Sequence, residues 1–335
     1  MSSVAPLGAA TVGLGVGEQH ARALASTPRC ALRWVYDLDQ AKASRLAAEL
    51  GARAAARLDE ILDDAEVQLV TVASYDDAHF GQTVAALAAG KHVFVEKPLC
   101  RSLDELGRIY AAWQTSRRHL SANLVLRGAP LYQWLREAIA AGELGEIYAI
   151  DGDYLYGRLH KITEGWRKDV TDYSVMQGGG VHMVDLMLWL TQQRPASVTA
   201  AGTSIATRGT AFRYHDFQAA TFRFTSGLIG RVTANFGAVQ PHQHVLRVFG
   251  TRATFIHDDR GARLQRSRQP GADWTPIEKA DVPASKGVLI APFIDSILDG
   301  RARVEQTRQE FDLVASCLAA DRAAASGASE AITYV

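Results

Sequence analysis

The stretch AATVGLGVGEQHA, residues 9–21, places three glycines between a short apolar run and a segment that suits a helix. The apolar run predicts a strand, and Gly13, Gly15 and Gly17 predict a tight turn into the helix. Backbone N–H groups at a helix start reach a pyrophosphate only where side chains are absent. The spacing is G-x-G-x-G and not G-x-G-x-x-G, so a glycine turn that binds no ligand is the alternative interpretation.

The same rhythm of strand, turn and helix continues to about residue 120. Runs rich in apolar residues predict further strands at 31–37, 67–74 and 92–98, with helices at 39–51, 78–90 and 102–116 between and after them. Ser102 and Glu105 form an S-x-x-E capping box at the start of the last helix. This alternation predicts βαβ units and a parallel, doubly wound sheet. We expect a first α/β domain over residues 1–122.

The second half of the chain has a different pattern. FQAATFRFTSGLIGRVTANFG, residues 217–237, contains two segments of alternating apolar and polar residues around Thr-Ser-Gly, which predicts a hairpin. HVLRVFGTRATFIHDD, residues 244–259, repeats this pattern, and residues 305–327 predict a closing helix. We expect an α+β domain over residues 123–335, built on an open, largely antiparallel mixed sheet with one covered face. The two halves are expected to pack together and leave a cleft.

The composition excludes several classes of protein. Lys plus Arg equals Asp plus Glu, at 36 each in 335 residues, so no net field attracts nucleic acid or an acidic membrane. Cys30, Cys100 and Cys317 form no C-x-x-C pair, which is typical of a reducing compartment. The sequence lacks a signal-peptide pattern and any run near the ~18 apolar residues of a membrane span. We expect a soluble, cytoplasmic protein without nucleic-acid or membrane partners.

An acidic residue ends the second predicted strand. Asp37 follows LRWVY, where a carboxylate can bind the adenosine ribose hydroxyls and repel a 2′-phosphate. Together with the glycine turn it predicts NAD as cofactor, with NADP less favoured. The alternative role for Asp37 is a cap for the next helix, although Asp39 is equally placed for that.

A charged triplet ends the strand at 92–98. Glu96, Lys97 and Pro98 follow HVFV directly, at the sheet edge where ligands bind in open α/β folds. Glu96 can accept hydrogen bonds from a ribose hydroxyl, and Lys97 can donate a proton to a carbonyl or alkoxide. Pro98 fixes the direction of Lys97, and a cis bond is one way to do so. The alternative interpretation is a solvated strand end.

A third candidate element is YSVMQGGGVHMVDLMLWLTQ, residues 173–192. His182 and Asp185 are three apart on a helical pattern, so they face the same way, and the glycines at 178–180 allow close approach of a ligand. His182 titrates near neutrality and can take a proton from a substrate hydroxyl. The alternative is a capping histidine beside a surface aspartate. No further ligand lies at a useful spacing, so no metal site is predicted.

The glycine turn with its following histidine (GLGVGEQHA), Asp37, AGKHVFVEKPL and GGGVHMVDLMLWL together resemble the Gfo/Idh/MocA oxidoreductase family. The similarity extends to LREAIAAGELGEI and TFRFTSGLIGRV, and so over nearly the whole chain. The resemblance implies an N-terminal Rossmann domain, a C-terminal domain with an open mixed sheet, and a nicotinamide cofactor. It implies that Lys97 is catalytic, that Glu96 contacts the nicotinamide ribose and that His182 carries a proton.

The predicted site adds further residues to these, among them Trp166 and Arg167 of EGWRKD, which the resemblance places at the cofactor or substrate pocket. The predicted cofactor-binding residues are Gly13, Gly15, Val16, Gly17, Asp37, Ser74, Tyr75, His79, Glu96, Lys97, Trp166 and Arg167. The predicted substrate-binding residues are Lys97, Asn123, Tyr154, Arg167, Tyr173, His182 and Asp185.

Two features depart from the family pattern. The glycine turn is one residue shorter than the family's commonest version. Many members carry an aspartate four residues before the motif histidine, and this chain has Gly178 there. Under the resemblance, proton transfer then depends on Lys97 and His182 alone, or on Tyr173 or Asp185.

The leading hypothesis is an NAD-dependent oxidoreductase that interconverts a secondary alcohol and a ketone on a sugar or nucleotide-linked sugar. The alternatives are an inositol, cyclitol or free-sugar dehydrogenase and, from another class, a non-catalytic NAD-binding sensor or regulatory protein. The resemblance and the exposed face of the second sheet predict a homodimer or homotetramer.

Overall fold

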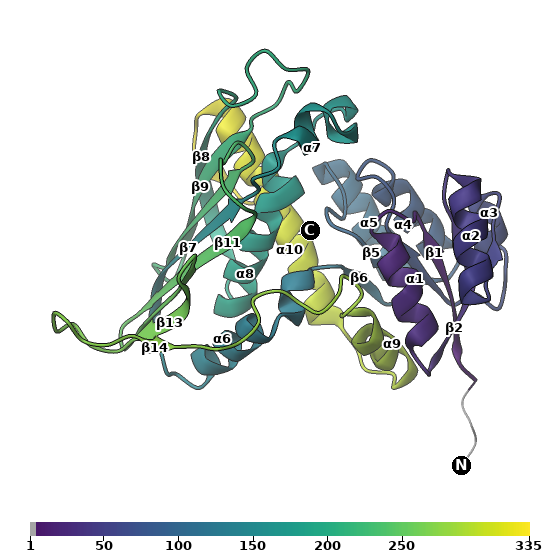
Figure 1. The fold of residues 1–335 in the computed structure, drawn as a ribbon, viewed down its shortest axis with the longest axis horizontal. Helices are drawn as coiled ribbons and strands as arrows, with labels where there is room; N and C mark the ends of the chain where they lie inside the picture. Colours follow the sequence, from purple (N-terminus) through teal and green to yellow (C-terminus); the bar gives the residue numbers. More distant parts are fainter. Residues whose placement is uncertain (1–4) are drawn as a thin grey trace. The chain divides into compact units, whose positions relative to one another are not determined.

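The computed structural model describes residues 5–335, which form two compact units (Figure 1). The first unit contains the chain up to Gly128 together with Pro283–Phe311. The second contains Ala129–Val282 and Asp312–Val335. Within the described residues, none of the helices combines the length and the apolar character that crossing a bilayer requires.

The first unit is built on a six-stranded sheet in the order β3-β2-β1-β4-β5-β6, and all its strands are parallel. Strands and helices alternate along the chain, which confirms the predicted doubly wound α/β fold. The strands are β1 (Leu7–Val12), β2 (Cys30–Tyr36), β3 (Arg53–Ala54), β4 (Leu69–Val72), β5 (His92–Val95) and β6 (Leu120–Ala122). The helices are α1 (Gly17–Ser26), α2 (Gln40–Leu50), α3 (Leu58–Leu62), α4 (His79–Ala88), α5 (Leu103–Ser116), the 3₁₀ turn η1 (Val125–Gly128), α9 (Ile290–Leu298) and the start of α10 (Val304–Ser326).

The helix boundaries follow the predicted capping signals. The Ser102 side chain accepts a hydrogen bond from the Glu105 N–H at the start of α5, and the Glu105 carboxylate accepts one from the Arg101 N–H. Helix α2 ends at Gly51, whose φ of 69° is a left-handed conformation that glycine adopts without strain.

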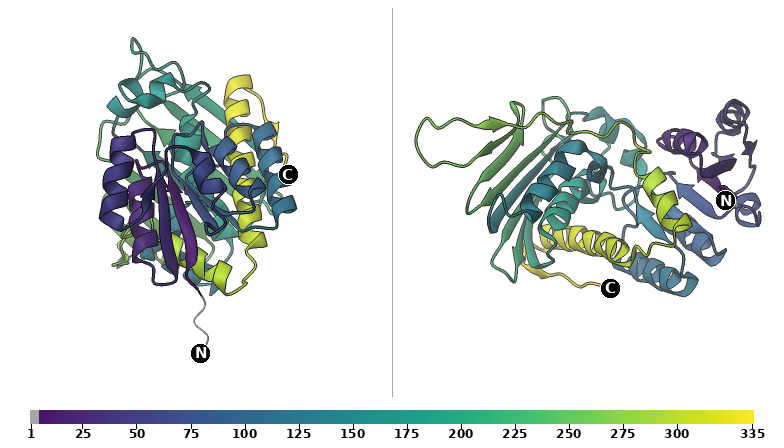
Figure 2. Two further views of the ribbon diagram at one scale, coloured as in Figure 1. Left: turned by 90° about the vertical axis from the view of Figure 1, so that its right-hand side faces the viewer. Right: turned by 90° about the horizontal axis from the view of Figure 1, so that it is seen from below.

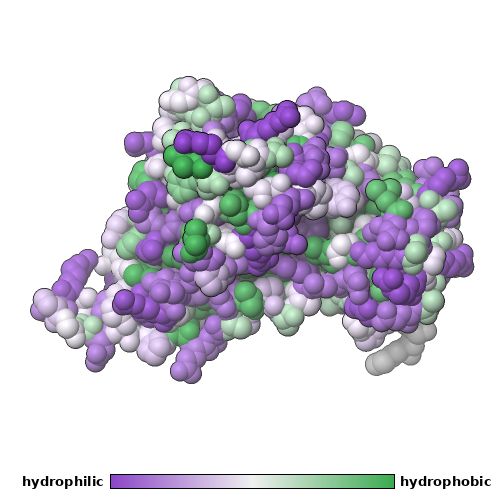
Figure 3. All heavy atoms as spheres, turned by 45° about the horizontal axis from the view of Figure 1, so that its top comes forward, coloured by the Kyte–Doolittle hydropathy of each residue, from purple (hydrophilic) through white to green (hydrophobic). Residues whose placement is uncertain are grey.

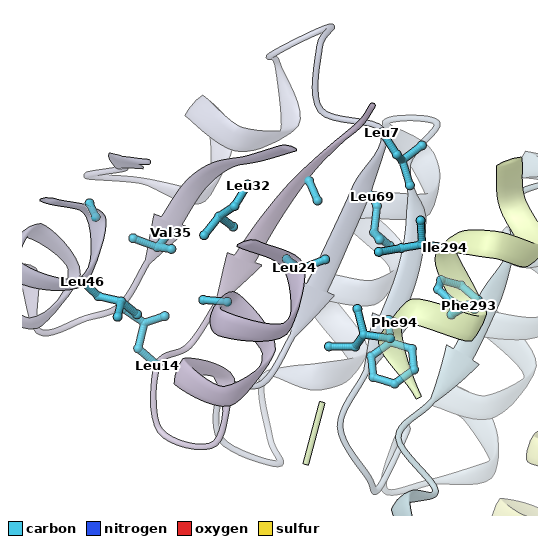
Figure 4. Packing of buried hydrophobic residues seen from close by; sticks show 14 of the residues in the cluster. Leu7, Leu14, Leu24, Leu32, Val35, Leu46, Leu69, Phe94, Phe293 and Ile294 are labelled. Carbon is cyan, nitrogen blue, oxygen red and sulfur yellow. The ribbon is translucent and has the colours of Figure 1, made fainter. Parts of the chain in front are cut away.

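The core of this unit lies between the sheet and the helices α1, α2 and α9 (Figure 4). Leu7, Leu69 and Phe94 of the strands pack with Phe293 and Ile294 of α9. Helices α4 and α5 pack together on the other face of the sheet (Figure 2). The strands β1, β4, β5 and β6 are therefore buried on both faces, as continuous apolar runs predict, whereas β2 and β3 are only partly buried.

The second unit is built on a nine-stranded sheet in the order β14-β13-β12-β11-β7-β10-β9-β8-β15. Only β7 and β10 pair in parallel, which confirms the largely antiparallel mixed sheet. Its strands are β7 (Ile147–Leu155), β8 (Pro195–Thr203), β9 (Phe217–Phe224), β10 (Ile229–Asn235), β11 (Gln243–Gly250), β12 (Thr254–Asp258), β13 (Gly261–Gln265), β14 (Thr275–Pro276) and β15 (Glu330–Ala331). Its helices are α6 (Pro130–Ala140), α7 (His160–Thr163), the 3₁₀ turn η2 (Trp166–Asp169), the π-helical turn η3 (Met176–Gly180), α8 (Val181–Thr191) and α10 from Asp312 onward.

Both predicted hairpins are present, as β9–β10 and β11–β12. Ala220, Phe222 and Phe224 are buried on one face of β9, whereas Arg223 on the other face is exposed. Helices α6, α8 and the second half of α10 cover this buried face (Figures 1 and 2). The other face carries no helix among the described residues of the unit, so one side of the sheet is open, as expected.

The open face of the sheet is stabilised by charged pairs. Asp151 accepts a hydrogen bond from Nε of Arg231 at 2.8 Å, and Asp153 accepts hydrogen bonds from Thr233 and Arg247. On the side of the molecule that Figure 3 shows, hydrophobic residues are scattered among hydrophilic ones.

Candidate active site

The glycine turn joins β1 to α1 as the sequence predicts. Gly13 has a φ of 81°, and a β-carbon there would lie 2.6 Å from the carbonyl carbon of Ala73. A β-carbon on Gly17 would lie 2.9 Å from that of Ala73, so glycine allows α1 to approach β4 closely. At Gly15, by contrast, a β-carbon would meet open space, and the next residue, Val16, is exposed. The turn therefore leaves backbone open at a helix N-terminus, which fits the pyrophosphate of a dinucleotide.

Asp37 lies directly after β2 and holds this turn in place. Its Oδ2 accepts a hydrogen bond from the Leu14 N–H at 2.6 Å, and its Oδ1 accepts one from the Asp39 N–H at 2.9 Å. Asp39 caps α2 by accepting from the Lys42 N–H. The capping alternative thus applies to Asp39, and Asp37 lies between the glycine turn and the next helix.

The loop after β4 is connected to the charged triplet by a buried histidine. The His79 ring lies within hydrogen-bond distance of the Pro98 carbonyl oxygen, at 2.8 Å from Nδ1, and of the Ser74 carbonyl oxygen, at 3.2 Å from Nε2. The Ser74 hydroxyl donates to Gln82, and Tyr75 is 52% exposed. His79 therefore fixes two loops at the same edge of the sheet, and Tyr75 is open to a ligand.

Glu96 belongs to a buried polar cluster. Its Oε1 lies 3.2 Å from Nε2 of His20 and accepts a hydrogen bond from the Asn123 amide at 2.7 Å. The same amide donates to the Lys286 carbonyl oxygen at 2.8 Å. Burial alone would raise the pKa of the Glu96 carboxyl, but the hydrogen bonds from His20 and Asn123 and the charges of His20 and Lys97 together lower it to about 2. Glu96 is therefore a fixed anion and not a solvated strand end.

Lys97 follows at the carboxyl end of β5, half-buried, and its peptide bond to Pro98 is cis, as the sequence suggested. The His79 ring contacts the carbonyl of that proline. Next to Glu96, Nδ1 of His20 and Oδ1 of Asn123 are buried without a hydrogen-bond partner among the described residues. Such buried polar atoms are uncommon in proteins, and here they suit the hydroxyl groups of a ribose or a sugar.

The candidate residues of the second unit lie on and around α8. His182 and Asp185 both lie on this helix and are only 8% and 1% exposed, so Asp185 is not a surface residue. The helix is preceded by the π-helical turn η3, a form that is frequent at functional sites. Asp321 of α10 anchors the turn, because it accepts hydrogen bonds from the Ser174 hydroxyl and the Gln177 amide, both at 2.7 Å.

Two tyrosines pack directly on the glycines of η3. A β-carbon on Gly178 would lie 2.9 Å from Cζ of Tyr173 and closer still to its hydroxyl, and one on Gly179 would lie 2.6 Å from Cδ1 of Tyr154. Both contacts are shorter than real β-carbon contacts. The glycines therefore allow close approach of the two tyrosines, where the sequence suggested close approach of a ligand.

Trp166 and Arg167 lie in the short turn η2, with the Arg167 guanidinium 4.5 Å from the centre of the Trp166 ring.

The structure groups the predicted residues in two sets, one in each unit. The first unit holds the glycine turn, Asp37, the loop after β4, the charged triplet and Asn123, and the second holds Tyr154, η2, Tyr173 and the α8 pair. Their roles, and the joint action of Lys97 and His182, stay predictions.

Comparison with protein families decides the identity of the chain. Residues 7–124 match the family described as oxidoreductase family, NAD-binding Rossmann fold, and residues 132–256 match the GFO/IDH/MocA C-terminal domain. The chain belongs to the Gfo/Idh/MocA family. It is thus an NAD-binding member of an oxidoreductase family, as the resemblance implied.

Several curated proteins and solved structures are similar to this Gfo/Idh/MocA chain. Inositol 2-dehydrogenase 2 of Saccharopolyspora erythraea is 31% identical over 56% of this chain and 55% of its own length. UDP-N-acetylglucosamine 3-dehydrogenase of Acidithiobacillus ferrooxidans is 26% identical over 71% of this chain and 69% of its own length. The solved structure of GenD2 from gentamicin A biosynthesis, in complex with NAD, has a TM-score of 0.83 and 27% identity and covers 99% of this chain and 98% of its own. The chain spans about half the length of the first curated relatives that it matches.

The sequence reasoning missed several residues of both sets. In the first unit it quoted His20 without assigning the contact with Glu96. In the second unit it missed Tyr156, Phe236, His242 and His244, whose rings surround that of Tyr154. The signal for the last two is the H-x-H pattern of residues 242–244, since positions two apart on a strand share a face.

Proposed function

We propose that this Gfo/Idh/MocA protein is an NAD-dependent oxidoreductase that interconverts a secondary alcohol and a ketone on a sugar or nucleotide-linked sugar. The observation that carries the proposal is the pair formed by Glu96, which is held as an anion, and Lys97, at the carboxyl end of β5. A buried anion followed by a lysine, beside buried polar atoms of His20 and Asn123 that lack a hydrogen-bond partner, suits a hydroxyl-rich ligand. A solvated strand end needs none of these features.

The cofactor would be held by the first unit. When bound, NAD supplies the chemistry of accepting a hydride from a carbon atom, and NADH that of returning it. The open backbone at Gly15 and the N-terminus of α1 receive the pyrophosphate, and Asp37 binds the adenosine ribose hydroxyls. Glu96 accepts a hydrogen bond from the nicotinamide ribose.

Lys97 and His182 transfer the proton of the substrate hydroxyl. The Lys97 ammonium donates a hydrogen bond to the substrate oxygen and stabilises the charge that develops there. The neutral imidazole of His182 accepts the hydroxyl proton during oxidation and returns it to the alkoxide oxygen during reduction. The His182 ring is 8% exposed, and the Tyr154 ring is stacked against it at 6.0 Å between ring centres. Burial of this kind limits the access of water to a proton in transfer.

Turnover of NAD with a panel of sugars tests the proposal. Purified protein is expected to form NADH with at least one of UDP-N-acetylglucosamine, myo-inositol and glucose. Lys97→Met is expected to lower kcat by about 100- to 10,000-fold while the Kd for NADH, measured by nicotinamide fluorescence, stays the same. The matched control is Lys279→Met, which removes an exposed lysine of the second unit and leaves both quantities unchanged. Full turnover by Lys97→Met would refute the assignment.

Two alternatives are outcomes of the same experiment. If the protein turns over myo-inositol or glucose but not the nucleotide sugar, a cyclitol or free-sugar dehydrogenase is favoured. Similarity to an inositol 2-dehydrogenase supports this alternative. Saturable NADH binding without turnover of any substrate of the panel would favour a non-catalytic NAD sensor. Gly178 is the feature that supports this alternative, because it replaces the aspartate of many family members.

We also propose that the protein acts in the cytoplasm as a homodimer or homotetramer. The open face of the nine-stranded sheet supports an oligomer, since it carries half-buried apolar side chains such as Phe249 and Ile256 beside its ion pairs. Light scattering coupled to size exclusion measures the mass in solution, and a monomer at micromolar concentration would contradict this.

A further inference from the structure

Three imidazoles and two tyrosines meet where two inner strands of the nine-stranded sheet, β7 and β11, end and begin. β7 ends at Leu155 and its antiparallel neighbour β11 begins at Gln243, where His244 is the register partner of Tyr154. The Tyr154 ring centre lies 5.1 Å from that of His242 and 5.4 Å from that of His244. Tyr156 lies 5.7 Å from His242. The H-x-H pattern therefore places both histidines on the helix-covered side of the sheet.

The histidine at the start of α8 completes this group. His182 and His244 lie 5.9 Å apart between ring centres, and His242 and His244 lie 4.8 Å apart. We call His182, His242 and His244 the imidazole cluster. The cluster extends from the buried His182 to the half-buried His242. Nδ1 of His242 lies 3.1 Å from the Leu155 carbonyl oxygen.

The charges around β7 are separated by side of the sheet. The carboxylates of the strand, Asp151 and Asp153, lie on the open face, where Arg231, Arg247 and Thr233 bind them. On the other side the next charged residue of the chain is Arg158, whose guanidinium lies 5.3 Å from the centre of the Tyr156 ring. The cluster therefore has the Arg158 guanidinium nearby and lies on the side of the sheet away from these two acids.

The Tyr154 hydroxyl is also close to positively charged side chains. Burial and the neighbouring Tyr156 raise the pKa of the Tyr154 hydroxyl, and the charges of Arg158 and Arg167 oppose this. Acids of the surrounding elements have other partners. Asp321 binds Ser174 and Gln177, and Asp216 accepts hydrogen bonds from the N–H and hydroxyl of Thr207. Burial raises the pKa of the Cys317 thiol of α10, and the charges of Asp321 and of Asp185, on α8, raise it further.

We propose that His242 and His244 of the imidazole cluster, with Arg158, bind an acidic group of the substrate, a carboxylate or a phosphate, while the sugar ring lies against the aromatic faces of Tyr154 and Tyr156. The proposal rests on the proposed function and names the class of substrate. Imidazole N–H and guanidinium groups form charge-assisted hydrogen bonds with oxyanions, and aromatic faces suit the C–H groups of a sugar. The same charges repel an amino sugar.

Binding of four sugars that differ only at carbon 6 tests the inference. Glucose is neutral there, glucuronate carries a carboxylate, glucose 6-phosphate a phosphate, and 6-amino-6-deoxyglucose an ammonium group. NADH-loaded protein is titrated with each sugar by calorimetry at pH 6.5. Both acids are expected to bind about tenfold more tightly than glucose, and the amino sugar more weakly than glucose. UDP-glucose, added as a fifth probe, distinguishes a nucleotide diphosphate from a simple phosphate.

Two variants assign the effect to the cluster. His244→Gln keeps the size and the hydrogen-bonding capacity of the site but cannot be charged, and Arg158→Met removes the exposed guanidinium. Each is expected to reduce the preference for the acids severalfold without changing the affinity for glucose or NADH. Arg213→Met, which removes an exposed arginine of the same unit, is the matched control and should change nothing. The preference should also decline toward pH 9, because imidazole is charged only when protonated, and in high salt.

Equal affinity for glucose and both acids, tighter binding of the amino sugar, or an unchanged preference in His244→Gln would overturn the inference. None of these results touches the proposed function, because NAD-dependent turnover of a neutral sugar and its loss in Lys97→Met do not depend on His242, His244 or Arg158. Conversely, acid-selective binding without turnover would leave the acid site in place and reject the oxidoreductase reaction.

Discussion

The hydroxyl group of Tyr173 occupies the space that a side chain on residue 178 would need. A β-carbon there would lie 2.9 Å from Cζ of Tyr173 and closer to the hydroxyl oxygen, so the backbone of η3 and the tyrosine fit together only around a glycine. Residue 178 lies one helical turn before His182. The tyrosine therefore brings a polar group to the position where other family members were expected to carry an acid.

The first prediction concerns this fit. Gly178→Ala forces Tyr173 to move, and overpacking of this kind typically costs about 1–3 kcal/mol. The double variant Gly178→Ala/Tyr173→Ala should recover part of that loss, because the clash is gone. Chemical denaturation of the four members of this cycle measures the coupling. Additive effects of the two substitutions would show that the side chains do not compete for this space.

The second prediction concerns the hydroxyl itself. Tyr173→Phe keeps the ring between Phe212 and Phe236 and removes only the oxygen. If the hydroxyl assists proton transfer at His182, kcat should fall by about tenfold to a hundredfold, the size of one hydrogen bond to a charged group, with a changed pH profile.

Tyr214→Phe is the matched control for that variant. The Tyr214 hydroxyl accepts a hydrogen bond from the Asp172 N–H at 2.8 Å, so its loss should lower stability and leave the pH profile of kcat unchanged. Identical profiles for wild type and Tyr173→Phe would assign the tyrosine a packing role only.

Local patterns were sufficient to predict most of the fold. The capping serine of α5, the glycine that ends α2 and the two hairpins depend on neighbours within a few residues, and the structure has them as predicted. The return of α9 to the first unit was not visible in this way. Phe293 packs on Phe94, about two hundred positions earlier in the chain, and an apolar helix stripe does not reveal its partner.

In the candidate site, too, local features were predictable and contacts between distant segments were not. The charged triplet and the glycine turn are contiguous in sequence, and their chemistry was predicted from the residue types at a strand end. The contact between His20 and Glu96 and the ring contact between Tyr154 and His244 join distant segments through sheet topology and strand register. Register is set by packing of the whole sheet, so no local pattern indicates which side chains become neighbours.

The third prediction separates the two aspartates after β2. Asp37→Ala removes the carboxylate that faces the glycine turn, so the Kd for NAD should rise about tenfold or more and the preference over NADP should shrink. Asp39→Ala removes the cap of α2, which costs about 1 kcal/mol of stability, and should leave the NAD to NADP ratio unchanged. Fluorescence titration with both reduced cofactors measures the two ratios. An unchanged ratio in Asp37→Ala would contradict the role assigned to it.

The fourth prediction uses the low pKa of Glu96. Its pKa is about 2 in the folded chain and near 4.5 when unfolded, so the carboxylate stabilises the fold above pH 4.5, and this contribution is lost as the pH falls through 2. The difference in the free energy of unfolding between wild type and Glu96→Gln should therefore shrink between pH 4.5 and 2, by at most about 3 kcal/mol. Denaturation at a series of pH values measures it, with exposed Glu278→Gln as control. A difference that is constant over this range would exclude the ionised, hydrogen-bonded state of Glu96.

The fifth prediction has the opposite sign and concerns Glu310 of α10. This carboxyl accepts hydrogen bonds from the Ser121 hydroxyl at 2.8 Å and from the Ala122 N–H at 2.6 Å, directly before Asn123. Burial raises its pKa to about 7, although these hydrogen bonds and the charges of two arginines oppose the rise. The folded state therefore binds a proton more tightly than the unfolded state, so stability is greatest below pH 4.5 and declines up to about pH 7.

Glu310→Gln keeps an acceptor for the Ala122 N–H and carries no charge at any pH. Relative to this variant, wild type should lose up to about 3 kcal/mol of unfolding free energy between pH 4.5 and 7 and little above that. Glu305→Gln, on an exposed position of the same helix, should run parallel to wild type. Because Asn123 follows the segment that Glu310 holds, ionisation of this carboxyl should also weaken NADH binding as the pH passes 7 in wild type and leave Glu310→Gln unaffected. Parallel stability curves for Glu310→Gln and wild type would show that the Glu310 carboxyl is already ionised at low pH. Burial would then not raise its pKa.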